Sequence, residues 1–273
     1  MSDEAVYLVA AARTPFGSFF GALRERPAED LAAVCIDAVV ERCGVEPSAV
    51  DALYAGVGML AAGVLTPARR AVLASGLPDT TPSMAVDRAC CSGMTAIGLG
   101  LRELRGGDAR LVICGGFDSL SRTPLLAERR RRTRPGDPAS WDPGAAAADP
   151  LRLESPLGRR TIAEYTGEEA LAHGVTREQQ DDWAVTSHRR YFEAQADGAF
   201  SRELIALPEL DHDESPRRST GQDALARLPT LYGSATITAG NAPGLSDGAA
   251  FVALARASAV RELSLEPIAR LHA

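Results

Sequence analysis

The sequence has 273 residues, of which 45% are hydrophobic and 24% are charged, a composition typical of a soluble globular protein with one or two domains. Its formal net charge of −7 argues against a general nucleic-acid binder. No uncharged run is long enough to span a bilayer, so we expect neither a nucleic acid nor a membrane among its partners.

The first part of the chain alternates apolar strands with helices. Apolar runs predict three strands, at 5–10, 50–57 and 110–114, and a further strand directly before Cys90. Apolar residues at helical spacing predict helices at 28–42 and 66–75. Because the strands are apolar throughout, this alternation predicts an α/β fold with a mostly parallel sheet covered on both faces.

The rest of the chain is organised around the stretch that contains Cys90 and Cys91. No charge occurs between Cys90 and Leu101, so the helix expected there is apolar on all sides and normally buried. A cysteine at a helix N-terminus lies where unpaired N–H groups and the helix dipole favour a thiolate. This context favours an activated sulfur nucleophile, the alternative being that both cysteines are small core residues.

The second part of the chain is less regular. Residues 115–119 leave the sheet at its carboxyl edge, where open α/β sheets place their sites. An irregular excursion follows at 121–160, and its arginine run at 129–132 is interpreted as a solvated or intersubunit face. The remaining pattern predicts helices at 162–173 and 176–196, a polar loop at 211–216, a strand at 235–239 and an apolar return to the sheet at 249–255.

The cysteines and the N-terminus indicate a reducing compartment. The five cysteines lie mostly in apolar runs without CxxC spacing, which favours reduced thiols over disulfides or a metal site. Residues 1–6 lack a secretory pattern, so we expect a cytoplasmic protein. From the cysteine spacing we expect no bound metal.

Several motifs, in the right order, resemble those of the thiolases, acyl-CoA C-acyltransferases of Claisen type. The segment 11–17 resembles the family's opening motif, and Cys90-Cys91-Ser92-Gly93 resembles its nucleophile motif. Residues 115–124 match the family's motif at the end of the next strand, and 233–250 match the family's segment that re-enters the core. By this register Cys90, and not Cys91, is the nucleophile.

The resemblance implies one thiolase-like half: a mostly parallel five-stranded sheet with helices on both faces, plus an inserted α-rich loop domain. It implies an N-terminal core at 1–120, a substrate-covering loop domain at 121–232, and at 233–273 the return to the sheet with a stub of the linker to an absent second half. In the family that half carries the activating histidine and a second catalytic cysteine. The four histidines present are interpreted as surface or capping residues, namely His173, His188, His212 and His272.

The resemblance also implies contacts with CoA, in altered form. Arg217 matches an arginine that packs beside the CoA adenine, whereas Pro243 replaces a serine expected at the pantetheine chain. The other expected CoA contacts are Thr161, Ile162, Tyr232, Ala242 and Gly244. We therefore expect CoA or acyl-CoA as a substrate, with no permanently bound cofactor.

The implied function is that of the nucleophile-bearing subunit of a split thiolase, which forms an acyl-Cys90 intermediate for Claisen condensation or for thiolysis of a 3-oxoacyl-CoA. Since one sheet does not cover a helix that is apolar on every side, we expect a separate chain resembling the other half to dock there. This predicts a hetero-oligomer with further dimerisation, self-association through the same surface being the alternative. The alternative function is a non-catalytic half-thiolase scaffold or CoA-binding subunit of a related synthase complex.

Overall fold

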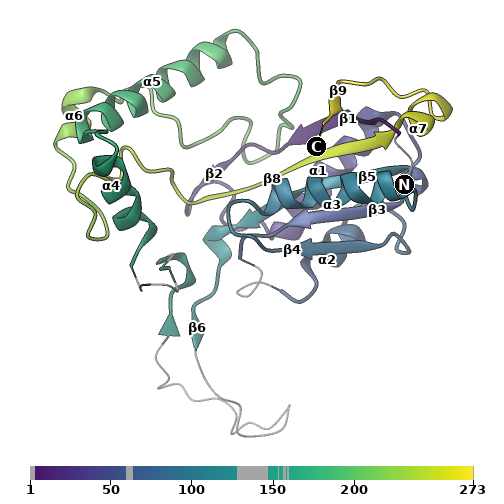
Figure 1. The fold of residues 1–273 in the computed structure, drawn as a ribbon, viewed down its shortest axis with the longest axis horizontal. Coiled ribbons are helices and arrows are strands. Elements are labelled where there is room, and N and C mark those ends of the chain that lie inside the picture. Colours follow the sequence, from purple (N-terminus) through teal and green to yellow (C-terminus); the bar gives the residue numbers. More distant parts are fainter. Residues whose placement is uncertain are drawn as a thin grey trace, which may run out of the picture.

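The structure is a computed structural model that describes residues 4–59, 64–127, 147–152, 154–155, 158 and 160–272. The arginine run expected at 129–132 lies outside the described residues. Seven strands form the main sheet, and helices lie on both of its faces (Figure 1). The α/β class expected from the sequence is confirmed.

The sheet has the strand order β4-β3-β5-β8-β1-β9, with β2 pairing to β8. Its strands are β1 (Val6–Arg13), β2 (Gly17–Ser18), β3 (Ala52–Gly56), β4 (Ser83–Val86), β5 (Leu111–Ser119), β8 (Ser246–Arg256) and β9 (Ala269–Leu271). A separate pair is formed by β6 (Leu126–Ala127) and β7 (Ala147–Ala148).

The sheet is larger and more mixed than the expected five mostly parallel strands. β3 pairs in parallel with β4 and β5, whereas β8 pairs antiparallel with β5, β1 and β2. The reason lies at the edge where β5 ends, because Ser119 there faces Asp247 at the start of β8. The chain leaves and re-enters the sheet at the same edge, so β8 has to run in the opposite direction.

The helices cover the two faces of the sheet unequally. They are α1 (Ala28–Cys43), α2 (Pro67–Ala74), α3 (Ser92–Gly106), α4 (Ile162–Ala172), α5 (Arg177–Ala196), α6 (Gln222–Ala226) and α7 (Ala257–Glu262). α1 and α2 pack on the main core cluster, which includes Leu31, Ile36 and Phe251. α3 packs on the other face, over a smaller cluster that includes Leu104 and Leu254.

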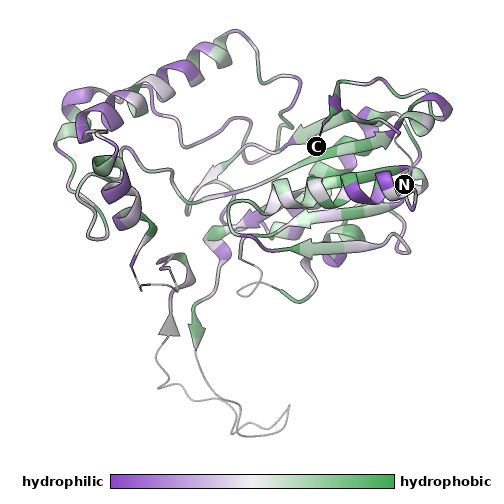
Figure 2. Cartoon of the chain, in the orientation of Figure 1, coloured by the Kyte–Doolittle hydropathy of each residue, from purple (hydrophilic) through white to green (hydrophobic). Residues whose placement is uncertain are grey.

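The helices of residues 121–232, called the loop segment below, begin where the sequence predicts. α4 and α5 start with capping boxes, in which Thr161 pairs with Glu164 and Thr176 pairs with Gln179. Both helices lie beyond the end of the sheet (Figure 1), and α5 is largely hydrophilic, in contrast with the apolar β5 and β8 (Figure 2). Among the described residues no helix is both long enough and apolar enough to cross a membrane.

The strand expected at 235–239 does not form. The Ser234 hydroxyl accepts hydrogen bonds from the N–H groups of Thr236 (3.4 Å) and Ile237 (3.1 Å). The Asn241 side chain accepts another from the N–H of Thr238 (2.8 Å). These side-chain acceptors satisfy the backbone locally, so 236–238 is buried with an isolated bridge between Thr230 and Thr238 in place of a sheet ladder.

Candidate functional site

Cys90 and Cys91 lie in the turn that joins β4 to α3. Both are exposed, so the alternative in which they are core residues is wrong for this chain. α3 begins at Ser92, directly after the two cysteines, and Cys91 occupies the N-cap position. The helix is also not buried on all sides, because Met94 in its first turn is 78% exposed.

The turn that presents Cys90 is fixed by hydrogen bonds on both sides of Ala89. Ala89 has a φ of 49°, a left-handed conformation that is costly for a residue with a side chain. The buried Ser92 hydroxyl accepts a bond from the Arg88 N–H (2.7 Å) and donates one to the Ala89 carbonyl (2.6 Å). The Asp87 carboxylate accepts the Ala89 N–H at 2.9 Å. This network sets the position of the backbone directly before Cys90.

Glycines bring the start of α3 close to the sheet. A Cβ atom on Gly56 of β3 would lie 2.4 Å from the backbone carbon of Ser92. A Cβ atom on Gly100 would lie 2.3 Å from the sulfur of Cys114 on β5. Only residues without a side chain allow this approach, so Cys90 is held at the carboxyl edge of the parallel strands.

Cys90 opens into a cleft of about 770 Å³ between α3 and the sheet. Its wall is mostly apolar and comes from α3, β1, β5, β8 and the loops at their ends. Residues that line it together with Cys90 include Gly58, Met59, Asp118, Pro243 and Gly244. A wide, largely apolar cleft with few polar groups is the usual form of a small-molecule site.

Asp118 is a carboxylate of this cleft that the sequence pattern does not single out. It lies on β5 and accepts hydrogen bonds from the N–H groups of Gly58 (2.9 Å) and Met59 (3.3 Å). Burial raises the pKa of Asp118 above its ordinary value, and the nearby charge of Asp87 acts in the same direction. Its place at the carboxyl end of a parallel strand is the one available sequence signal.

The residues expected to contact CoA fall into three groups. Pro243 and Gly244 line the cleft that holds Cys90. The buried Thr161 donates a hydrogen bond to the carbonyl of Tyr232 (3.0 Å), and the neighbouring Ile162 is exposed.

The third group lies away from the cleft lining. The Ala242 N–H donates to the Thr238 carbonyl at 3.0 Å, within the turn after the loop segment. Arg217 is exposed on the loop segment, and its N–H donates to Nδ1 of His188 on α5 (3.2 Å). The assignment of these residues to CoA remains a prediction.

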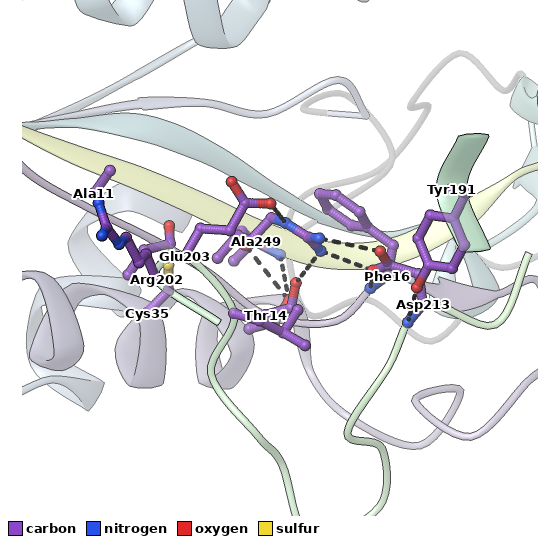
Figure 3. Close-up of polar contacts among 12 residues, drawn as sticks. Ala11, Thr14, Phe16, Cys35, Tyr191, Arg202, Glu203, Asp213 and Ala249 are labelled. Carbon is purple, nitrogen blue, oxygen red and sulfur yellow. Dashed lines mark hydrogen bonds and ion pairs between the residues drawn. The ribbon is translucent and has the colours of Figure 1, made fainter. Parts of the chain in front are cut away.

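A partly buried junction joins the cleft to the loop segment. The side chain of Arg13, at the end of β1, donates to Glu203 (2.7 Å) and through two nitrogens to Asp213 (2.7 and 3.1 Å). Asp213 also accepts the N–H of Phe16 (2.8 Å), and its own N–H donates to the Tyr191 hydroxyl (3.3 Å). Figure 3 shows the carboxylates of Glu203 and Asp213 on opposite sides of the guanidinium group that joins them. The motif at 11–17 thus anchors residues 203–213 beside the cleft.

Within the described part of the chain, no histidine lines the cleft. His188 is half-buried against Arg217, and burial together with the charge of Arg217 lowers its pKa. His212 pairs with Asp211 at 2.6 Å, and His173 and His272 are exposed. A base that would activate Cys90 is therefore not supplied by these four side chains.

The family model "Thiolase, N-terminal domain" matches residues 6–258. The chain belongs to the thiolase family. Among curated thiolase relatives, it is 37% identical to the beta-ketoadipyl-CoA thiolase of Pseudomonas aeruginosa, in an alignment that covers 99% of this chain and 70% of that protein. It is 35% identical to the acetyl-CoA acetyltransferase of Thiocystis violacea, covering 100% of this chain and 71% of that protein.

Solved thiolase structures share the fold. The acetyl-CoA acetyltransferase of Bacillus anthracis is 30% identical with a TM-score of 0.89, covering 98% of this chain and 69% of that one. Human mitochondrial 3-ketoacyl-CoA thiolase, solved in complex with CoA, has the same identity and TM-score, with 98% of this chain and 68% of that one covered. The thiolase fold with helices on both sheet faces is thus established.

Proposed function

We propose that this thiolase-family chain is an acyl-CoA C-acyltransferase subunit that carries the acyl group on Cys90. Its family membership supports an acyl-CoA acyltransferase function. The observation that carries the proposal is the exposed Cys90 thiol, held at the head of α3 in a mostly apolar cleft that suits an acyl chain.

The proposed chemistry needs a nucleophile that both forms and releases a thioester. A base takes the proton of the Cys90 thiol, and the thiolate attacks the carbonyl carbon of an acyl-CoA. The bond to the CoA sulfur breaks, and the CoA thiolate takes up that proton and leaves as the thiol. A base then removes the α-proton of a second acyl-CoA, and the carbanion attacks the Cys90 thioester. This step breaks the thioester bond and releases a 3-oxoacyl-CoA and the Cys90 thiolate, which takes the α-proton from the base, and thiolysis is the same sequence in reverse.

The base is proposed to come from a separate chain that resembles the C-terminal thiolase half. Two observations support a docking surface for it: the exposed Met94 on α3, and open space within 4 Å of a Cβ built on Gly98. A partner placed there would reach the cleft beside α3 and would supply the histidine and the second cysteine. Further dimerisation of that complex and a cytoplasmic location belong to the same proposal.

The experiment is acyl labelling by an acyl-CoA, read by mass spectrometry of the Cys90 peptide, with and without the candidate partner. We expect label on Cys90 only when the partner is present. The variant Cys90→Ser removes the label, and the matched control Cys91→Ser, at the other exposed cysteine of the turn, keeps it.

Absence of label under both conditions contradicts the proposal and favours the second candidate, a non-catalytic scaffold or CoA-binding subunit. Two features favour that candidate. Pro243 lines the cleft and has no N–H to donate, and the hydroxyl of Thr161 is already bonded to Tyr232. CoA binding without acyl transfer, measured by calorimetry, distinguishes a CoA-binding subunit from a scaffold.

A further inference from the structure

β5 extends past the end of β3 at the edge of the cleft. The last paired residues are Gly56 on β3 and Gly116 on β5, and Asp118 follows two residues later. Beyond that point the Asp118 carboxylate takes over the role of a strand partner, since it accepts the N–H groups of Gly58 and Met59. All three of these residues line the same cleft as Cys90.

Asp118 is a partly buried carboxylate, and no ion pair among the described residues includes it. Two backbone donors stabilise its charged form, yet burial and the charge of Asp87 outweigh them and raise its pKa. A desolvated carboxylate in a cleft beside a nucleophile is typical of a functional group rather than of a surface charge.

The charged side chains that line the cleft with Cys90 are Asp118, Arg13 and Glu203, and Arg13 is ion-paired with Glu203 and Asp213. Asp87 and the exposed Arg88 belong to the turn before Cys90, and Asp118 faces the cleft from β5. α3 carries no charge before Arg102, and Asp247 on β8 is bonded to Ser121. Because Asp118 and Cys90 line the same mostly apolar cleft, we expect a charge on Asp118 to act on a thiolate that forms at Cys90.

We propose that Asp118 is a positioning residue of the Cys90 site: its carboxylate fixes the cleft wall at Gly58 and Met59, and its charge sets the field in which the thiol reacts. This extends the proposed acyl transfer at the same site. Its test reads the thiol itself and needs neither a partner nor acyl-CoA, so the two proposals fail separately.

The chain contains a matched control at the opposite end of the same strands. Asp51 also accepts two backbone N–H groups, those of Arg110 (2.6 Å) and Leu111 (3.0 Å), beside β3 and β5. It does not line the cleft. Asp51→Asn therefore reproduces the structural loss of Asp118→Asn without changing the charge near Cys90.

The test is the rate of iodoacetamide alkylation of Cys90 in the full-length chain as a function of pH, in a Cys91→Ser background. Removing a negative charge from the cleft favours the thiolate. Asp118→Asn is therefore expected to move the pH midpoint down by about half a unit, a roughly threefold faster reaction at pH 7. Asp118→Glu retains the charge, so its midpoint stays at the wild-type pH, and Asp51→Asn gives the wild-type profile after correction for any loss of thermal stability.

Equal profiles for Asp118→Asn and Asp51→Asn overturn the proposal, because they show that Asp118 acts on folding alone. Asp118→Ser is a second neutral variant, for which the same downward shift is expected. Should neither neutral variant fold, the wild-type protein decides the matter. In that case it is compared with Asp118→Glu and Asp51→Asn alone, and a midpoint that moves in Asp118→Glu but not in Asp51→Asn contradicts the proposal.

Discussion

At the scale of single residues, the turn before α3 combines strain with hydrogen bonding at the residue that precedes Cys90, the proposed nucleophile. The left-handed Ala89 costs about 1–2 kcal/mol relative to an ordinary conformation. The Ser92 hydroxyl and the Asp87 carboxylate offset this cost by satisfying the backbone groups of the turn. Cys90 is thus presented by a backbone shape that its neighbours maintain, as is common where strain is found at functional sites.

Ser92→Ala is expected to lower the free energy of unfolding by about 1–3 kcal/mol, because it removes a buried hydroxyl that both accepts and donates. Urea unfolding measures the loss. Ala89→Gly in the same background is expected to recover part of it, since glycine adopts a positive φ without a clash. A wild-type unfolding midpoint for Ser92→Ala would show that the turn is held by other contacts.

Residues of the nucleophile motif are predictable from the sequence, whereas the carboxylates that support them are not. Cys90 and Ser92 are found from four consecutive letters and the helix that follows. The contacts of Asp118 depend on β5 extending past the end of β3. This follows from the strand register, which no local sequence pattern predicts. Asp87 likewise gains its role only through the positive φ of Ala89.

At the scale of elements, one face of α3 packs closely on the sheet and another face is open. Gly100 faces the sheet, where an added Cβ would meet the sulfur of Cys114 at 2.3 Å. Gly98 lies only two residues away, and an added Cβ there meets nothing within 4 Å. The sequence predicts an apolar helix but does not tell these two glycines apart.

The two glycines provide a matched pair of substitutions on one helix. Gly100→Ala is expected to lower the free energy of unfolding by about 1–3 kcal/mol through overpacking against β5. Gly98→Ala is expected to raise it by about 0.5–1 kcal/mol, because alanine is the better helix former where space is free. Thermal unfolding measures both, and equal effects would contradict the assignment of the two faces.

Element boundaries follow the sequence closely where capping residues or apolar periodicity specify them. α4 and α5 begin directly after Thr161 and Thr176, whose side chains bond to the first turn. The expected strand at 235–239 fails because Ser234 and Asn241 compete for its backbone, and β-branched residues alone do not reveal that competition. The direction of β8 is equally hidden, since it depends on where the loop segment returns to the sheet.

At the scale of the whole molecule, the two faces of the sheet differ in how fully they are covered. The face under α1 and α2 holds the main core cluster, whereas the face under α3 also holds the open, mostly apolar cleft. In Figure 1 the loop-segment helices lie beyond the end of the sheet and do not cover this face. The sequence anticipates this asymmetry because a helix without charges in its first turns needs a second layer there.

The proposed docking surface on α3 predicts a separation of folding from partner binding. Met94 is 78% exposed in the single chain, so Met94→Glu is expected to change the free energy of unfolding by less than about 0.5 kcal/mol. A carboxylate buried in an apolar interface without a partner is costly, so binding to the candidate C-terminal half is expected to weaken by tenfold or more, about 1.4 kcal/mol.

The matched control for this change is Leu73→Glu, because Leu73 is 58% exposed on α2, a helix that packs on the opposite face of the sheet. It introduces the same charge away from α3, so calorimetry of the complex should give the wild-type affinity. If both variants bind the partner equally well, the partner does not cover α3, and self-association then has to be tested by the same pair. A concentration-dependent dimer that Met94→Glu abolishes and Leu73→Glu preserves would assign the α3 face to a second copy of this chain.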